Sequence, residues 1–177
     1  MFVAPMGKSI IDEDLSNFVG LYAGAGSQPE VAHALEASDL VITIGNIQSD
    51  MNTAGFTYHF SQLNRIDIYY NQLDIGYATF AKVYFKSSIP HITRKIDSAR
   101  IAASAKTIPA VQKHIIDDGA GDDAAITHRY FRPVLTRFLK AGDVLVTETG
   151  TSVVGYWETK LPASVSVLNG DRSMVCS

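Results

Sequence analysis

The stretch that decides the fold is residues 27–45, SQPEVAHALEASDLVITIG. Ser27 stands three residues before Glu30, which is a capping-box pattern, and Pro29 suits the first turn of a helix. The apolar, largely β-branched run that ends at Gly45 is typical of a buried strand. This stretch therefore predicts a helix that leads directly into a parallel strand.

The same alternation continues towards the C-terminus. Residues 66–70, Ile-Asp-Ile-Tyr-Tyr, lie between two asparagines and predict the next strand. Ser88 is placed to cap a further helix, in which Ile89, Ile92 and Ile96 recur at helical spacing. Alternating strands and helices favour an α/β fold, with a doubly wound, mostly parallel sheet of the nucleotide-binding kind over residues 1–103.

The remainder of the chain predicts a linker and a second, incomplete α/β unit. Residues 104–126 break the pattern, with four acids and two glycines between Asp117 and Asp123. Thr127 is then placed to cap a helix, and residues 144–147 predict a strand. Because residues 127–177 are too few to close a core of their own, we expect them to dock on the first domain or to remain mobile.

Composition excludes several classes of protein. The formal net charge of the 177 residues is −3 and the isoelectric point is near 5.9, so no basic surface for nucleic acid is expected. No apolar run is long enough to cross a membrane, and the first residues lack the pattern of a signal peptide, which predicts an intracellular, cytoplasmic protein. The single cysteine, Cys176, allows neither an internal disulfide nor a cysteine-based metal site.

Two loops in the first hundred residues are candidates for ligand binding. The loop from Gly24 to Gln28 precedes a helix, as a phosphate-binding loop does, but Pro29 replaces the third glycine of the dinucleotide fingerprint. We therefore expect a tight turn there, with phosphate binding as the alternative. Residues 50–56 form a second polar cluster, interpreted as an Asx-type turn. The five histidines show no metal-binding spacing.

The best candidate site follows the strand predicted at residues 144–147. Residues 148–152, Glu-Thr-Gly-Thr-Ser, stand at its carboxyl end, where open α/β sheets place their ligands. Hydroxyl groups and a glycine turn offer hydrogen-bond donors to an anion. An ordinary strand-to-helix turn is the alternative for this segment.

These segments, in this order, resemble the thiamine-diphosphate-dependent 2-oxo-acid decarboxylases, and most closely the fungal pyruvate decarboxylases. The resembling stretches are PMGK at 5–8, DE at 12–13, FVGLYAG at 18–24, PEV at 29–31, SDL at 38–40, SDMNTAGF at 49–56, FL at 138–139, GD at 142–143 and ETGTS at 148–152. The resemblance implies a chain made of a central domain and the start of the carboxy-terminal, diphosphate-binding domain.

The resemblance also implies a chemistry. Enzymes of this family convert a small 2-oxo acid, such as pyruvate, to an aldehyde and CO2, with thiamine diphosphate and Mg2+ as cofactors. Within the match, Thr149, Gly150 and Thr151 would lie beside the cofactor, with Thr151 as the best candidate for a direct contact. The family further implies a homo-oligomer, either a dimer or a tetramer, with no nucleic acid or membrane partner.

The departures from the family are as informative as the matches. The family's catalytic glutamate and paired histidines belong to an amino-terminal domain that this sequence does not show. Its Gly-Asp-Gly-Ser magnesium motif is also missing, and GDRS at 170–173 follows the ETGTS segment too soon to replace it. From Leu168 onwards the sequence departs from the family. No residue is therefore assigned a catalytic role or a role as metal ligand.

These departures predict a fragment that is inactive alone. One alternative is a non-catalytic interaction module that binds a full-length decarboxylase. Another is a stand-alone nucleotide-binding domain.

Overall fold

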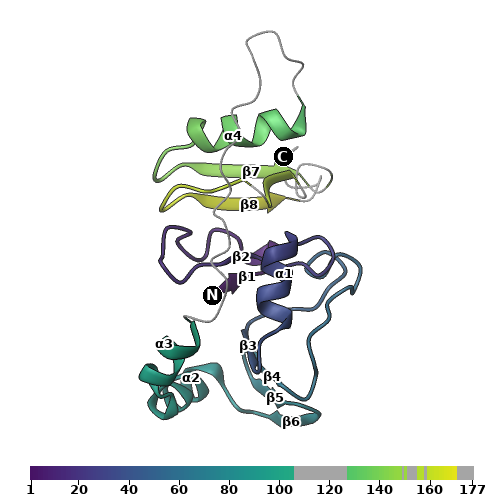
Figure 1. Cartoon of the computed structure of the whole chain (residues 1–177), viewed down its shortest axis with the longest axis vertical. Helices are drawn as coiled ribbons and strands as arrows, with labels where there is room; N and C mark the ends of the chain where they lie inside the picture. Colours follow the sequence, from purple (N-terminus) through teal and green to yellow (C-terminus); the bar gives the residue numbers. More distant parts are fainter. Residues whose placement is uncertain (106–126, 149, 151–154, 158, 171–177) are drawn as a thin grey trace. The chain divides into compact units, whose positions relative to one another are not determined.

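The computed structural model describes residues 1–105, 127–148, 150, 155–157 and 159–170 (Figure 1). The chain divides into two compact units, one formed by Met1–Leu21 with Gln112–Ser177 and the other by Tyr22–Val111. Both combine helices with β-structure, so the fold is of the α/β class that the sequence predicted.

The unit formed by Tyr22–Val111 contains the helix and the strand predicted from residues 27–45. Helix α1 (Pro29–Glu36) buries Val31, Ala34 and Leu35, and strand β3 (Val41–Ile44) follows after a short turn. Strand β4 (Arg65–Ile68) runs parallel to β3, with Val41 opposite Arg65 and Ile44 opposite Ile68. The predicted helix and both predicted strands are confirmed, with β4 shifted by one or two residues.

The sheet of this unit has two strands that the sequence did not predict. Strands β5 (Gln72–Ile75) and β6 (Ala78–Ala81) form antiparallel hairpins, so that the strand order is β3-β4-β5-β6. Only the β3–β4 pair is parallel. Gly76, at φ +59, makes the turn between β5 and β6, because glycine adopts left-handed backbone without a Cβ penalty.

Two of the predicted helix caps are wrong. Helix α1 begins after Gln28, and the Ser27 hydroxyl instead accepts a hydrogen bond from the Ala23 N–H at 2.7 Å. Helix α2 (Phe85–Lys95) begins three residues before Ser88, whose hydroxyl donates to the Phe85 carbonyl. In both places, the serine hydroxyl bonds to a backbone group three or four residues earlier in the chain instead of capping the helix. A further helix, α3 (Ser98–Ala105), follows.

In the other unit, residues 1–21 pack with the C-terminal part of the chain. Strands β1 (Phe2–Val3) and β2 (Gly20–Leu21) pair in parallel, and the short 3-10 helix η1 (Pro5–Gly7) follows β1. Helix α4 (His128–Phe138) is capped by Thr127, as the sequence predicted. The Thr127 hydroxyl accepts a hydrogen bond from the Tyr130 N–H at 3.2 Å.

Strands β7 (Val144–Glu148) and β8 (Ser166–Gly170) pair in parallel and carry the core of this unit. Leu139, Leu161 and Val165 are buried there and are packed against Leu145 and Val167, one from each strand. The Tyr156 hydroxyl donates to the Pro5 carbonyl at 3.1 Å, and the Val167 N–H donates to the Ser9 hydroxyl at 3.1 Å. The segments at 155–157 and 159–170 therefore dock on the first 21 residues.

Gly24 is the glycine whose substitution should cost the most. It has φ +56, and a Cβ there would lie 2.6 Å from the Thr57 hydroxyl and 2.8 Å from the Thr53 carbonyl oxygen. We expect Gly24→Ala to lower the free energy of unfolding by about 2–3 kcal/mol, because backbone strain and a steric clash act together. Urea denaturation followed by circular dichroism measures this loss.

Gly55 provides a matched control. It is also left-handed, at φ +77, but no atom lies within 4 Å of an added Cβ. Gly55→Ala should therefore cost only the backbone strain of about 1 kcal/mol. Equal losses for the two variants would show that the packing around Gly24 contributes nothing.

Candidate functional site

The candidate site lies where strands β7 and β8 end. The two strands are parallel and in register from Val144 opposite Ser166 to Glu148 opposite Gly170, so their carboxyl ends share one edge. Gly150, predicted to bind a cofactor, is exposed in a turn two residues beyond β7, and no atom lies within 4 Å of a Cβ added there. Thr149 and Thr151, the other two predicted residues, lie outside the described residues.

Two buried polar atoms near this edge have no hydrogen-bond partner among the described residues. They are the hydroxyl oxygen of Thr147 and the side-chain carbonyl oxygen of Asn169, and the two residues are opposite each other in the β7–β8 pair. A buried hydroxyl without a partner costs free energy, which a ligand at the strand ends would recover by accepting its proton. Sequence reasoning did not assign either residue, because a threonine inside a strand has no signature of its own.

The described residues give no independent sign of a metal site. Within them, no group of three or more His, Cys, Asp or Glu side chains converges so that it could hold an ion. The Thr147 hydroxyl and the exposed turn at Gly150 would be the hydrogen-bond donors for thiamine diphosphate at this edge. Donors of this kind suit an oxyanion or a ring nitrogen.

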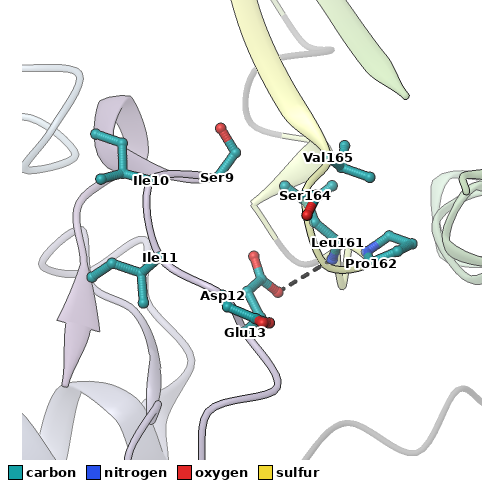
Figure 2. A pocket seen from close by; sticks show the side chains of 9 residues that line it. All are labelled: Ser9, Ile10, Ile11, Asp12, Glu13, Leu161, Pro162, Ser164 and Val165. Atoms are coloured by element: carbon teal, nitrogen blue, oxygen red, sulfur yellow. Dashed lines mark hydrogen bonds between the residues drawn. The ribbon is translucent and has the colours of Figure 1, made fainter. Parts of the chain in front are cut away.

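A separate cleft lies at the amino end of β8 (Figure 2). It has a volume of about 220 Å3 and is lined by residues 9–13 on one side and by Leu161, Pro162, Ser164 and Val165 on the other. Both serines that line it have left-handed backbones, Ser9 at φ 78 and Ser164 at φ 64. The cleft is at the opposite end of β8 from Gly150, so it is not part of the predicted cofactor site.

A buried ion pair fixes one wall of this cleft. The Lys8 ammonium lies 2.6 Å from Glu13 Oε1, and both side chains are more than nine-tenths buried. Glu13 Oε2 accepts a hydrogen bond from the Leu161 N–H at 3.3 Å (Figure 2). Burial lowers the pKa of Lys8, while the charge of Glu13 opposes that shift. All of these contacts hold chain segments together, so we interpret the pair as structural.

In the glycine loop that precedes α1, three consecutive backbone N–H groups are bonded within the protein. The Ala25 N–H donates to Thr57 Oγ1 at 2.8 Å, and the N–H groups of Gly26 and Ser27 each donate to a backbone carbonyl at 3.0 Å. Groups of the protein thus take the hydrogen bonds that phosphate oxygens would accept in a dinucleotide-binding loop. The geometry favours the tight turn that we expected from Pro29.

Residues 50–56 form a turn, as the sequence predicted. Asp50 Oδ1 accepts from the Met51 N–H at 2.8 Å, and the Asn52 amide donates to the Ile47 carbonyl at 2.7 Å. The Thr53 hydroxyl donates to the Ser49 carbonyl at 2.7 Å. The polar side chains of this cluster are therefore used to build a turn, in which Asp50 bonds to the N–H of the next residue.

Comparison with known proteins identifies the family. A family model described as the thiamine pyrophosphate enzyme central domain matches residues 1–96. The chain therefore belongs to the thiamine pyrophosphate enzymes, as its resemblance to that family implied.

Similar proteins within the family are fungal pyruvate decarboxylases. The chain is 40% identical over 169 residues to pyruvate decarboxylase of Aspergillus fumigatus and 37% identical over 169 residues to that of Aspergillus terreus. It is 30% identical over 161 residues to pyruvate decarboxylase isozyme 3 of Saccharomyces cerevisiae. These alignments cover 91–95% of this chain but only 28–29% of the relatives. The chain thus spans less than a third of their length.

The buried pair of Lys8 and Glu13 is expected to contribute strongly to stability. Glu13→Gln should lower the free energy of unfolding by about 3–5 kcal/mol, because it leaves the Lys8 ammonium buried without a counter-charge. The loss should shrink as the pH rises towards 10.5, the ordinary lysine pKa, because Lys8 in the folded chain releases its proton first. Urea denaturation followed by fluorescence of Trp157, the only tryptophan, measures both effects.

Asp14→Asn is the matched control for this prediction. Asp14 pairs with Lys160 at 2.5 Å, but about half of each side chain is exposed. Loss of an exposed pair should cost less than about 1 kcal/mol at any pH. A cost for Glu13→Gln no larger than this would contradict the importance of the buried pair.

Proposed function

We propose that this chain is part of a thiamine-diphosphate-dependent 2-oxo-acid decarboxylase of the pyruvate decarboxylase type. In this proposal residues 1–103 form the central domain, 104–126 a linker, and 127–177 the start of the diphosphate-binding domain with a divergent tail from Leu168. The complete enzyme would convert pyruvate, a small 2-oxo acid, to acetaldehyde and CO2. The names and identities of the fungal relatives support this assignment.

The observation that carries the proposal is the position of Gly150. It stands in an open turn beyond the carboxyl end of a parallel strand, which is where α/β sheets bind their ligands. Thr149, Gly150 and Thr151 would contact thiamine diphosphate, and the buried Thr147 hydroxyl would donate a further hydrogen bond. The cofactor, when bound with Mg2+, supplies the electron sink for decarboxylation.

We further propose that the chain alone does not decarboxylate pyruvate. The sequence supplies no counterpart of the family's catalytic glutamate or of its magnesium motif, and no residue takes their place. The proposed protein acts in the cytoplasm as a homo-oligomer, a dimer or a tetramer, without nucleic acid or membrane partners. Among the described helices, none is both long and apolar enough to span a bilayer.

The second candidate function is a non-catalytic module that binds a full-length decarboxylase. Its support is the number of large apolar side chains left exposed in the Tyr22–Val111 unit. Ile44 is 64% exposed and Leu63 is 69% exposed, where a domain covered by neighbours would bury such groups. Co-purification of the tagged chain with a full-length relative distinguishes this candidate from the first.

Isothermal titration with thiamine diphosphate and Mg2+ tests the proposed cofactor site. We expect the unaltered chain to bind, and Thr147→Val to weaken binding by about 3- to 10-fold, because one hydrogen bond is lost. Removing a buried hydroxyl without a partner should leave the free energy of unfolding unchanged or higher. Loss of affinity and retention of stability are thus separate readouts.

Thr159→Val is the control for this titration. The Thr159 hydroxyl is also buried and also lacks a partner among the described residues, but it does not lie at the strand ends. Its removal should leave the affinity for thiamine diphosphate unchanged. No binding by the unaltered chain, or equal weakening by both variants, would argue against the site at Gly150 and favour the interaction module.

A further inference from the structure

The first residues of the chain hold one edge of strand β8. The Ser166 N–H donates to the carbonyl of Asp143, the residue that precedes β7, at 3.0 Å. Because successive residues of a strand point their N–H groups to opposite sides, the Val167 N–H faces away from β7. The Ser9 hydroxyl accepts this N–H at 3.1 Å. A side-chain oxygen thus has the role that a backbone carbonyl has in a strand ladder.

A second hydrogen bond joins the same segment to β8. The Asn169 side-chain amide donates to Met6 Sδ at 3.7 Å. A thioether sulfur is a weak acceptor, whereas a hydroxyl oxygen is a good one. Of these two hydrogen bonds to β8, the one to Ser9 is therefore the stronger.

Ser9 makes this contact from a strained backbone. Its φ of 78 lies in the left-handed region, where a residue with a Cβ carries a free-energy penalty. Its neighbour Lys8 is held in place by the ion pair with Glu13 at 2.6 Å. Glycine would adopt the same backbone without strain, but glycine has no hydroxyl to accept the Val167 N–H. Serine at this position thus combines a local penalty with a fixed contact to β8.

The contact bears on the candidate site through the geometry of β8. Val167 precedes Asn169 by two residues, which is about 7 Å along a strand. Asn169 lies opposite Thr147, whose buried hydroxyl has no hydrogen-bond partner among the described residues. A displacement of β8 would therefore separate the two strand ends at which the candidate site lies.

We propose that Ser9 is a positioning residue for the candidate cofactor site. Its hydroxyl fixes β8 beside β7 and so keeps the two strand ends together where thiamine diphosphate would bind. This inference rests on the function proposed above. Ser9 acts through β8 and does not touch the cofactor, because its hydrogen bond lies near the amino end of the strand and the site lies at the carboxyl end.

Two substitutions separate this role from a general effect on stability. Ser9→Ala removes the hydroxyl and keeps the strain, whereas Ser9→Gly removes both. Ser9→Ala should lower the urea concentration at the midpoint of unfolding. Ser9→Gly should leave it close to that of the unaltered chain, because relief of strain offsets the lost hydrogen bond. Both variants should nevertheless weaken the binding of thiamine diphosphate with Mg2+ by about 3- to 10-fold in isothermal titration.

Hydrogen exchange, followed by NMR on the chain without cofactor, tests the position of β8 directly. In both Ser9 variants we expect the amides of Val167 and Leu168 to exchange at least about tenfold faster. Val167 loses its own acceptor, whereas the Leu168 N–H faces β7 and reports whether β8 stays paired. Faster exchange confined to Val167 would overturn the proposal, because β8 would then keep its place without Ser9.

Ser164→Gly is the matched control. Ser164 lines the same cleft and also has a left-handed backbone, at φ 64 (Figure 2). Among the described residues, however, its hydroxyl makes no hydrogen bond to β8. Ser164→Gly should raise the urea midpoint without changing the affinity for thiamine diphosphate or the exchange of Leu168. Weakening equal to that of Ser9→Gly would contradict a specific role for Ser9.

The titration distinguishes failure of this inference from failure of the proposed function. Binding by the unaltered chain, with the same affinity in both Ser9 variants, would refute the positioning role and leave the proposed function intact. No binding by the unaltered chain would instead contradict the proposed function. In that case the exchange of Leu168 would still decide whether Ser9 fixes β8.

Discussion

One contact, the buried pair of Lys8 and Glu13, supports the whole unit formed by Met1–Leu21 and Gln112–Ser177. Strands β7 and β8 form only a two-stranded sheet, which by itself buries too little apolar surface to be stable. Glu13 neutralises Lys8 with one oxygen and accepts the Leu161 N–H with the other. One carboxylate thereby joins the first residues of the chain to the core of Leu139, Leu161 and Val165.

A second buried pair stabilises the four-stranded sheet of the other unit. Arg65 and Asp67 lie on one face of β4, 2.6 Å apart, and both are more than nine-tenths buried. Asp67 also accepts the Thr43 hydroxyl from β3 at 2.7 Å, and the Arg65 guanidinium lies 5.6 Å from the centre of the Phe60 ring. Polar contacts therefore occupy one face of β4, while the opposite face is apolar.

The site proposed for thiamine diphosphate depends on two parallel strands that end together and on an open turn beyond one of them. It also depends on the buried Thr147 hydroxyl, which has no hydrogen-bond partner among the described residues. The family to which the chain belongs is shown by the match to the thiamine pyrophosphate enzyme central domain, whereas the use of this site remains the proposal.

The sequence was sufficient to predict those helices and strands that have a clear periodicity or a capping residue of their own. Helix α1, strand β3, the Thr127 cap and strand β7 follow from periodicity and from single polar residues, and the order of motifs was enough to indicate the family. The short strands β5 and β6 were missed because four residues on either side of Gly76 are too few for a clear alternation. A capping pattern also does not reveal whether another backbone group competes for the capping side chain. The Ser27 hydroxyl, for example, accepts from the Ala23 N–H instead of capping α1.

Tertiary structure alone decided which distant residues meet. Glu13 and Leu161 are separated by 148 residues, and nothing in either segment encodes the other. The sequence likewise does not reveal that the Thr147 hydroxyl is buried without a hydrogen-bond partner among the described residues, because this depends on the segments packed around it. Periodicity reports what a segment does with its nearest neighbours, whereas burial and pairing depend on segments that only folding brings together.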